Sequence, residues 1–237
     1  MNTADVPGFM LSMPSVFRLS AKGRLHHLLD MERLKASLSF DAATYNLSFL
    51  RPLLPSSVSL PNGMRLNGRV KADGQRYAAA VNLCEGRGTV AVKGDVNVRT
   101  MAYNAAIAAK GLDLSHFIPG RGLHVFSGHL AASGLGTDIM SARTSLKADA
   151  SVAQLRFAGH DFAGLKAAVK VAGGHAWAEV SNNSNLFNGS VRLDGQLHQR
   201  RWSANVQCNL LDADFKKLGI TRRPFNVALR SHLLLAS

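Results

Sequence analysis

The sequence is poor in the residues that build thick cores and covalent frameworks. Aromatic residues make up only 7% of its 237 positions, and many of the apolar positions are Ala or Val. Side chains this small fill the space between two packed layers poorly. The two cysteines, Cys84 and Cys208, lie far apart and predict neither a disulfide framework nor a metal-binding spacing. No apolar run reaches the roughly 18 residues of a membrane-spanning helix.

Acidic residues are also scarce, with 15 Asp and Glu against 28 Lys and Arg, a formal net charge of +13. No paired carboxylate or nucleophile motif stands out, so we expect no enzymatic activity, no cofactor and no metal. The positive charge raises a nucleic acid or an anionic membrane as a partner. No basic cluster interleaves with aromatic residues as in a single-strand binder, so we expect no nucleic acid. The interpretation favoured here is that the basic side chains occupy the exposed phase of strands.

What the sequence has is strict alternation of apolar and polar residues. Residues 89–99, 165–171, 189–197 and 202–210 each place an apolar residue at every second position. A period of two puts alternate side chains on opposite faces of a sheet, and such strands are typical of antiparallel sheets with one wet face. The pattern is clear from residue 65 onward, whereas residues 1–64 form an ambiguous strand-rich segment. We therefore expect a repeated β-groove segment over 65–237 that continues beyond the C-terminus.

Gly, Asp and Asn turn signals divide this region into strands of eight to twelve residues with their turns. We expect strands at residues 65–73, 76–84, 87–93, 95–99, 102–110, 123–133, 143–152, 154–158, 163–171, 175–181, 185–197 and 202–210.

A longer repeat overlies the strands. A strand led by an aromatic residue, Tyr103 or Trp202, is followed nine residues later by a Leu and then an Asp. Asp113 and Asp214 are each placed to cap a short helical turn. A degenerate copy begins at Tyr45. Units that cannot bury their own apolar face stack on their neighbours.

In this order, the features resemble the TamB proteins of Gram-negative bacteria, within the AsmA-like family, and most closely the versions in Bacteroidetes. The similarity covers roughly residue 60 to the C-terminus. It rests on residues 103–109, Gly111-Leu112-Asp113-Leu114, Phe117-Ile118-Pro119, 128–133, Gly134-Leu135-Gly136-Thr137-Asp138, 141–152, 165–171, the turn Ser181-Asn182-Asn183, and 212–219.

The resemblance implies an all-β fold, an elongated twisted β-groove (an open β-solenoid or β-taco) of repeated antiparallel strands with short helical turns. It implies an internal segment of a translocation and assembly module protein, anchored in the inner membrane and periplasmic in this part. The implied function is phospholipid transport between the inner and outer membranes, assembly of outer-membrane proteins, or both. The implied partners are phospholipid acyl chains and, through regions outside this segment, an outer-membrane barrel assembly protein.

An acyl chain needs a continuous apolar strip, and each buried methylene contributes about 0.8 kcal/mol. The candidate lipid-groove residues are Val90, Val92, Val96, Val98, Ala105, Ile107, Leu146, Ala148, Val152, Leu165, Ala167, Val169, Val171, Val191, Leu193, Ala204 and Val206. Two alternatives stay open from the sequence. These residues can pack against one another as a closed β-core, or the chain can be a β-solenoid adhesin or autotransporter-like interaction protein that binds no lipid.

Overall fold

A computed structural model describes residues 3–27, 29–30, 32–55, 57–184, 187–198, 201–216, 221, 223 and 227–236. The chain divides into two compact units, Met1–Val125 (unit 1) and Phe126–Ser237 (unit 2). Each unit is described separately below.

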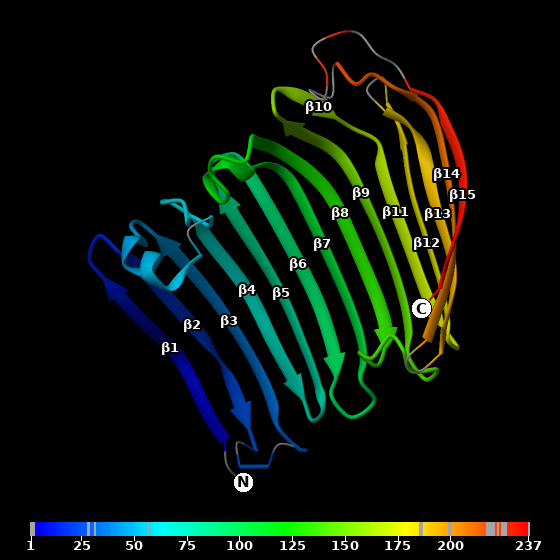
Figure 1. The fold of residues 1–237 in the computed structure, drawn as a ribbon. Coiled ribbons are helices and arrows are strands. Elements are labelled where there is room, and N and C mark those ends of the chain that lie inside the picture. The colour runs from blue at the N-terminus through cyan, green and yellow to red at the C-terminus, as the bar shows by residue number, and fades with distance from the viewer. Residues whose placement is uncertain are drawn as a thin grey trace. The chain divides into compact units, whose positions relative to one another are not determined.

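Unit 1 is an antiparallel sheet in which each strand pairs with the next along the chain (Figure 1). Its strands are β1 (Thr3–Met13), β2 (Phe17–His26), β3 (Lys35–Thr44), β4 (Arg65–Asp73), β5 (Arg76–Glu85), β6 (Gly88–Asn97) and β7 (Ala102–Asp113). Two short 3-10 helices, η1 (Ser48–Leu53) and η2 (Leu114–His116), follow β3 and β7. Strand β8 (Leu123–Leu135) begins at the boundary between the units.

Unit 2 repeats this arrangement, again with antiparallel neighbours in sequence order. After β8 come β9 (Ser145–Phe157), β10 (His160–Phe162), β11 (Leu165–Ala172), β12 (His175–Asn183), β13 (Phe187–His198), β14 (Arg201–Ala213) and β15 (Leu229–Ala236). Strand β10 pairs only with β9, and β11 takes the next place in the sheet. The predicted all-β class, with antiparallel strands and short helical turns, is confirmed.

Register turns the alternation of each strand into two continuous faces. Residues paired across a ladder point to the same side of a sheet. Val169 pairs with Ala148 and with Ala178, and Ala178 pairs with Leu193, so apolar positions meet apolar positions on four successive strands. A shift by one residue would exchange the two faces, so this match fixes the register.

Two glycines on the apolar face of unit 1 are covered by larger neighbours. A Cβ added at Gly68 would lie 2.7 Å from the Phe40 ring, and one at Gly23 would lie 2.7 Å from a methyl of Leu38. Gly68 pairs with Phe40 and Gly23 pairs with Leu38 across their ladders. The larger residue of each pair therefore lies over the glycine and takes the space of the missing side chain.

Several strand predictions are corrected. The strands predicted at 87–93 and 95–99 are replaced by the single strand β6, residues 88–97, because Gly94 continues its ladder opposite Ala105. The strands predicted at 143–152 and 154–158 are likewise replaced by the single strand β9, residues 145–157. Residues 181–183, predicted as a turn, belong to β12, where Asn183 pairs with Asn188. Residues 185 and 186, expected in a strand, lie outside the described residues.

The larger repeat is found in part. Asp113 caps η2: its carboxylate accepts the Ser115 backbone N–H at 3.0 Å. The copy that begins at Tyr45 also ends in a 3-10 helix, η1, and the Asn46 side chain there accepts the Ser48 N–H at 3.0 Å. Asp214 lies in a β-bridge followed by a turn, and residues 217–219 of the expected landmark lie outside the described residues.

Candidate functional site

The apolar face of unit 2 consists of rows that cross the strands at right angles. One row contains Ala148, Val169, Ala178, Leu193, Val206 and Leu233, one residue from each of β9 and β11–β15. The next row along the strands contains Ala150, Ala167, Val180, Val191, Cys208 and Ser231. Small and aliphatic side chains therefore extend across six strands without a charged residue.

The apolar face of unit 1 has the same construction. One row contains Gly23, Leu38, Val70, Ala79, Gly94 and Ala105, and the next contains Ala21, Phe40, Gly68, Val81, Val92 and Ile107. Neighbouring strands lie about 4.8 Å apart, so a row over six strands spans roughly 24 Å. One leaflet of a bilayer core is about 15 Å thick, so either row is longer than an acyl chain in its leaflet.

The structure brings the candidate lipid-groove residues, called strip residues below, together within each unit. In unit 1, Val90, Val92, Val96, Ala105 and Ile107 share the apolar face of β6 and β7. In unit 2, all eleven candidates lie on the apolar face: Leu146, Ala148, Val152, Leu165, Ala167, Val169, Val171, Val191, Leu193, Ala204 and Val206. Val98 is the exception, because it lies in the turn after β6 and is half exposed.

These apolar faces stay largely uncovered by the described chain. Val92, Ile107, Val180 and Val191 each keep between 37% and 41% of their surface exposed. The chain exposes 15822 Å² in total, whereas a folded monomer of 25.4 kDa exposes about 10,000 Å². Among the described strands, close contacts are those between ladder neighbours. The exposed strip residues therefore face open space or an occupant from outside the described chain, whereas Val171 and Ala204, at 6% and 7% exposed, are buried.

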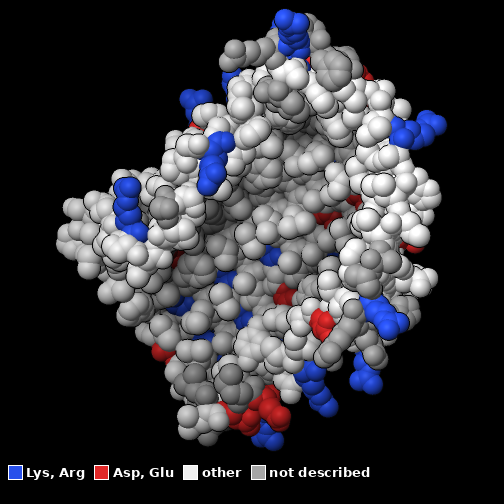
Figure 2. Space-filling model, viewed as in Figure 1, with Lys and Arg blue, Asp and Glu red and all other residues white. Residues whose placement is uncertain are grey.

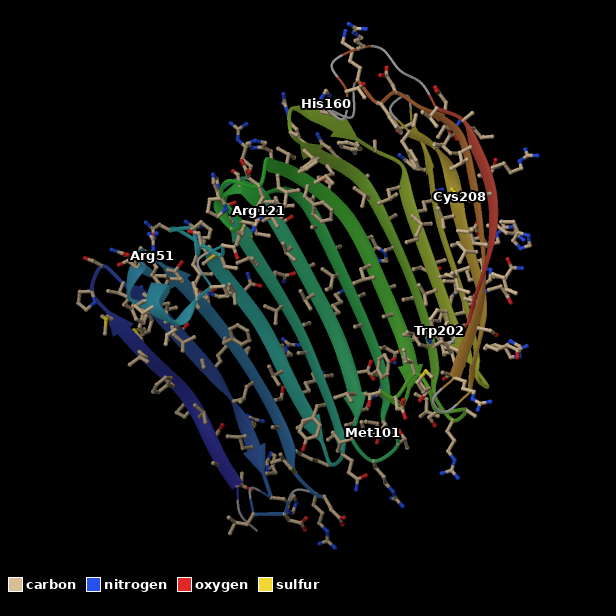
Figure 3. The ribbon with its side chains drawn as sticks, in the orientation of Figure 1. Arg51, Met101, Arg121, His160, Trp202 and Cys208 are labelled. Carbon is tan, nitrogen blue, oxygen red and sulfur yellow. The ribbon has the colours of Figure 1, made fainter. Side chains whose placement is uncertain are left out.

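Cys208 and Trp202, both labelled in Figure 3, lie on β14 and belong to the apolar face of unit 2. Cys208 pairs with Val191 and Ser231, and Trp202 pairs with Leu197. Cys84 differs from Cys208, because it lies in unit 1 on the opposite, polar face, between Arg65 and Thr89. Both thiols are free and partly exposed.

The polar faces carry the charged side chains. Lys93, Lys147, Lys166, Lys170 and Arg192 lie on these faces, as the alternation predicts. In unit 2, Arg192 pairs with Glu179 at 3.0 Å. The Lys170 ammonium lies 5.5 Å from the centre of the Trp177 ring, within cation–π range.

A cluster at the end of β5 was missed by sequence reasoning, which ended the predicted strand at residue 84, one residue before Glu85. Glu85 is only 6% exposed, and its carboxylate lies 2.6 Å from Nδ1 of His116. Asp113 lies 3.9 Å from the other ring nitrogen of His116. The Ser115 hydroxyl donates to Asp113 at 2.7 Å, and this hydrogen bond lowers the pKa of Asp113 below its usual value. The 31-residue separation of Glu85 and His116 gives no sequence signal.

Among the described residues, no group of three His, Cys, Asp or Glu side chains is placed to hold a metal ion. No helix in the described part of the chain is both long and apolar enough to cross a membrane. No protein-family model, curated protein or solved structure matches the chain.

Proposed function

We propose that the apolar faces hold the acyl chains of phospholipids. In this proposal the chain is a segment of a TamB/AsmA-like envelope protein that moves phospholipid between the inner and outer membranes, supports outer-membrane protein assembly, or does both. The observation that carries it is the uninterrupted apolar row across six strands, whose side chains remain exposed to an occupant.

The size of the side chains supports a lipid over a packed protein layer. A face built mainly from Ala, Val and Gly projects few large groups that could interlock with a second sheet or helix. A flexible acyl chain needs no such interlocking, and each methylene it buries contributes about 0.8 kcal/mol. The two apolar rows of unit 2 contain no charged residue, which would interrupt the path of an acyl chain.

The β-solenoid adhesin alternative is less well supported. A closed coil buries its apolar side chains inside, yet Val180 and Val191 are 41% and 39% exposed. The envelope location and the outer-membrane barrel partner rest on the resemblance of the landmark residues alone.

The proposal is tested with a matched pair of double variants in unit 2. Val180 and Val191 pair across β12 and β13 on the apolar face, and Ser181 and Ser190 are the adjacent pair on the polar face. One variant is Val180→Asp with Val191→Asp, and the other is Ser181→Asp with Ser190→Asp. Each adds two negative charges at paired positions, the first on the apolar face and the second on the polar face. The full chain is incubated with a phospholipid that carries a photoreactive acyl chain, and cross-linked sites are mapped by mass spectrometry.

We expect cross-links at apolar-face residues of the wild type, their loss near β12 and β13 in the valine variant, and their retention in the serine variant. The circular dichroism of a β-sheet should persist in both variants. Equal cross-linking in all three proteins, or cross-links confined to polar-face residues, would contradict the proposal. Loss of the sheet signal in the valine variant alone would favour the closed-core interpretation.

A further inference from the structure

The polar face of unit 1 carries an unusual density of positive charge. Its ladder positions hold ten basic residues, Arg18, Lys22, Arg24, Lys35, Arg65, Arg69, Lys71, Arg76, Lys93 and Lys110. Four acidic residues, Asp5, Asp41, Asp73 and Asp95, lie on the same face. The difference, ten minus four, is a net charge of +6 on one side of a seven-stranded sheet.

Ion pairing leaves the middle of this face unneutralised. Ion pairs join Arg24 to Asp5, Lys35 to Asp73 and Arg76 to Asp95. All seven of the remaining basic side chains are exposed and form no ion pair with another described residue, and five of them remain when Arg18 and Lys110, at the two ends of the row that contains Arg65, are set aside. We call these five the basic patch: Lys22, Arg65, Arg69, Lys71 and Lys93.

The strand register explains why the side chains of the basic patch have no acidic residue opposite them in the ladders. Lys22, Arg69 and Lys93 belong to one row, in which Ser39 and Ala80 occupy the strands between them. Alternate strands lie about 10 Å apart, and Lys71 follows Arg69 on β4 by about 7 Å. The basic patch is therefore a two-dimensional array of charges, spaced at roughly one Debye length in physiological salt.

Unit 2 provides a comparison on the same fold. Its polar-face ladder positions on β9 and β11–β15 hold six basic residues, Lys147, Lys166, Lys170, Arg192, Arg201 and Arg230, and four acidic ones, Asp149, Glu179, Asp194 and Asp212. In its middle row Asp149 lies 3.5 Å from Lys147, and Glu179 pairs with Arg192. Lys166, Lys170, Arg201 and Arg230 form no ion pair with another described residue, but the net charge of this face is six minus four, +2, against +6 in unit 1. A solvated sheet face of this type thus does not require a large excess of like charge, which repels itself in the folded state.

We propose that the basic patch binds the surface of an anionic phospholipid bilayer. Like charges gathered on one face are unfavourable unless an anionic partner neutralises them, and a bilayer presents its phosphates as a two-dimensional array. Lys and Arg side chains are visible on the surface in Figure 2. Each Lys or Arg near an anionic bilayer contributes about fivefold in binding, which corresponds to about 1 kcal/mol.

A bilayer fits better than a nucleic acid. The five polar-face rows across β2 to β7 contain Ser, Ala, Asn, Cys, Thr and His between the charges and no Phe, Tyr or Trp side chain on which a base could stack. The choice of a lipid surface also rests in part on the proposed function, in which this chain handles phospholipid on its other face.

The test compares two triple variants of the full chain. The patch variant is Lys22→Gln, Arg69→Gln and Lys93→Gln, and the control variant is Lys166→Gln, Arg201→Gln and Arg230→Gln on the polar face of unit 2. Each lowers the formal charge from +13 to +10 by removing three positive charges. Binding is measured by co-sedimentation with vesicles of phosphatidylglycerol and phosphatidylcholine, with vesicles of phosphatidylcholine alone, and by mobility shift of a DNA duplex.

We expect the wild type to bind the phosphatidylglycerol vesicles in a salt-dependent way and to bind phosphatidylcholine vesicles much less. The patch variant should lose about 100-fold in affinity, from three contributions of about fivefold each, while the control variant should lose less than tenfold. Equal losses in both variants would overturn the inference, because net charge would then explain the binding. Tight binding of DNA with no binding of phosphatidylglycerol vesicles would also overturn it.

The acyl cross-linking variants separate this inference from the proposed function. If Val180→Asp with Val191→Asp removes cross-links but leaves vesicle sedimentation unchanged, both proposals stand. A wild type that sediments with vesicles but forms no apolar-face cross-links would retain the basic patch and overturn the acyl-chain proposal. A wild type that forms apolar-face cross-links but does not sediment with vesicles would overturn only the proposal that the basic patch binds a bilayer.

Discussion

Units 1 and 2 are alike on one face and different on the other. Both have apolar rows that cross six strands, built from the same small and aliphatic residue types. The polar face of unit 2 holds six basic and four acidic ladder residues, whereas that of unit 1 holds ten basic and four acidic ones and includes the basic patch. The difference indicates that the apolar face has a requirement common to both units, while the polar face is free to specialise.

Charged substitutions on the apolar face should reduce acyl-chain cross-linking alike in both units, and this is the largest effect we expect. Val92→Asp with Ile107→Asp places two charges on a cross-strand pair of the unit 1 apolar face. Because a carboxylate in an acyl-chain path is desolvated at a cost of about 2 kcal/mol or more, cross-linking near β6 and β7 should fall more than tenfold.

The matched control is Ala91→Asp with Ala108→Asp, the adjacent pair on the polar face of the same strands. It should leave cross-linking intact. If the control reduced cross-linking as strongly as the apolar-face variant, the likeness between the two apolar faces would have no functional meaning.

Substitution of a buried polar group should lower the free energy of unfolding more in unit 1 than in unit 2. In unit 1, Glu85 is buried and contacts His116, whose side chain is 51% exposed. His116→Ala leaves a buried carboxylate without this partner, which should lower the free energy of unfolding by about 2 kcal/mol. Urea unfolding followed by circular dichroism measures the change. His116→Ala should cost more than Glu85→Gln, because the glutamine variant removes the buried charge; the opposite order would refute this view of the cluster.

Asn182 is the contrasting group in unit 2. It is 6% exposed, and its Oδ1 has no hydrogen-bond partner among the described residues, although its Nδ2 donates to Ser184 at 3.1 Å. Asn182→Val removes an unsatisfied acceptor together with one hydrogen bond, so the free energy of unfolding should change by less than about 1 kcal/mol. A loss as large as that of His116→Ala would show that Asn182 is better satisfied than its geometry indicates.

The smallest effect concerns acid stability in unit 1. The Ser115 hydrogen bond lowers the pKa of Asp113 in the folded state, so the ionised carboxylate stabilises the fold at pH values above its unfolded pKa. That contribution should be lost as pH falls through the lower, folded pKa. Asp113→Asn should therefore reduce the stability difference between about pH 5 and pH 3, measured by urea unfolding at each pH. An unchanged or larger difference would contradict this assignment.

The sequence predicts the regular strands well because they alternate. The apolar-face positions of β9 and β11–β14 follow directly from the period of two, and Asp113 follows from its capping position. β1 was not predicted, because Pro7 and Gly8 interrupt it and residues 9–11 are apolar without alternation.

Other features depend on pairing between strands, which alternation does not encode. The alternation predicts that Lys22, Arg69 and Lys93 lie on the polar face. Their position in one row is set by the register of β2 to β6. The contact of Glu85 with His116 likewise arises only when β5 and η2 are brought together. Single glycines such as Gly94 resemble turn signals but continue a strand when the opposite ladder residue is small.

The two native cysteines allow the most direct test of the central claim that lipid occupies the apolar face. Cys208 lies on the apolar face of unit 2, and Cys84 lies on the polar face of unit 1. The alkylation rate of each thiol in the unmodified chain can be followed by mass spectrometry, with and without a short-chain phosphatidylcholine, whose neutral headgroup does not engage the basic patch. We expect the lipid to slow alkylation of Cys208 several-fold and to leave Cys84 unchanged. An unchanged rate at Cys208, or equal slowing at both thiols, would contradict acyl-chain binding to the apolar face.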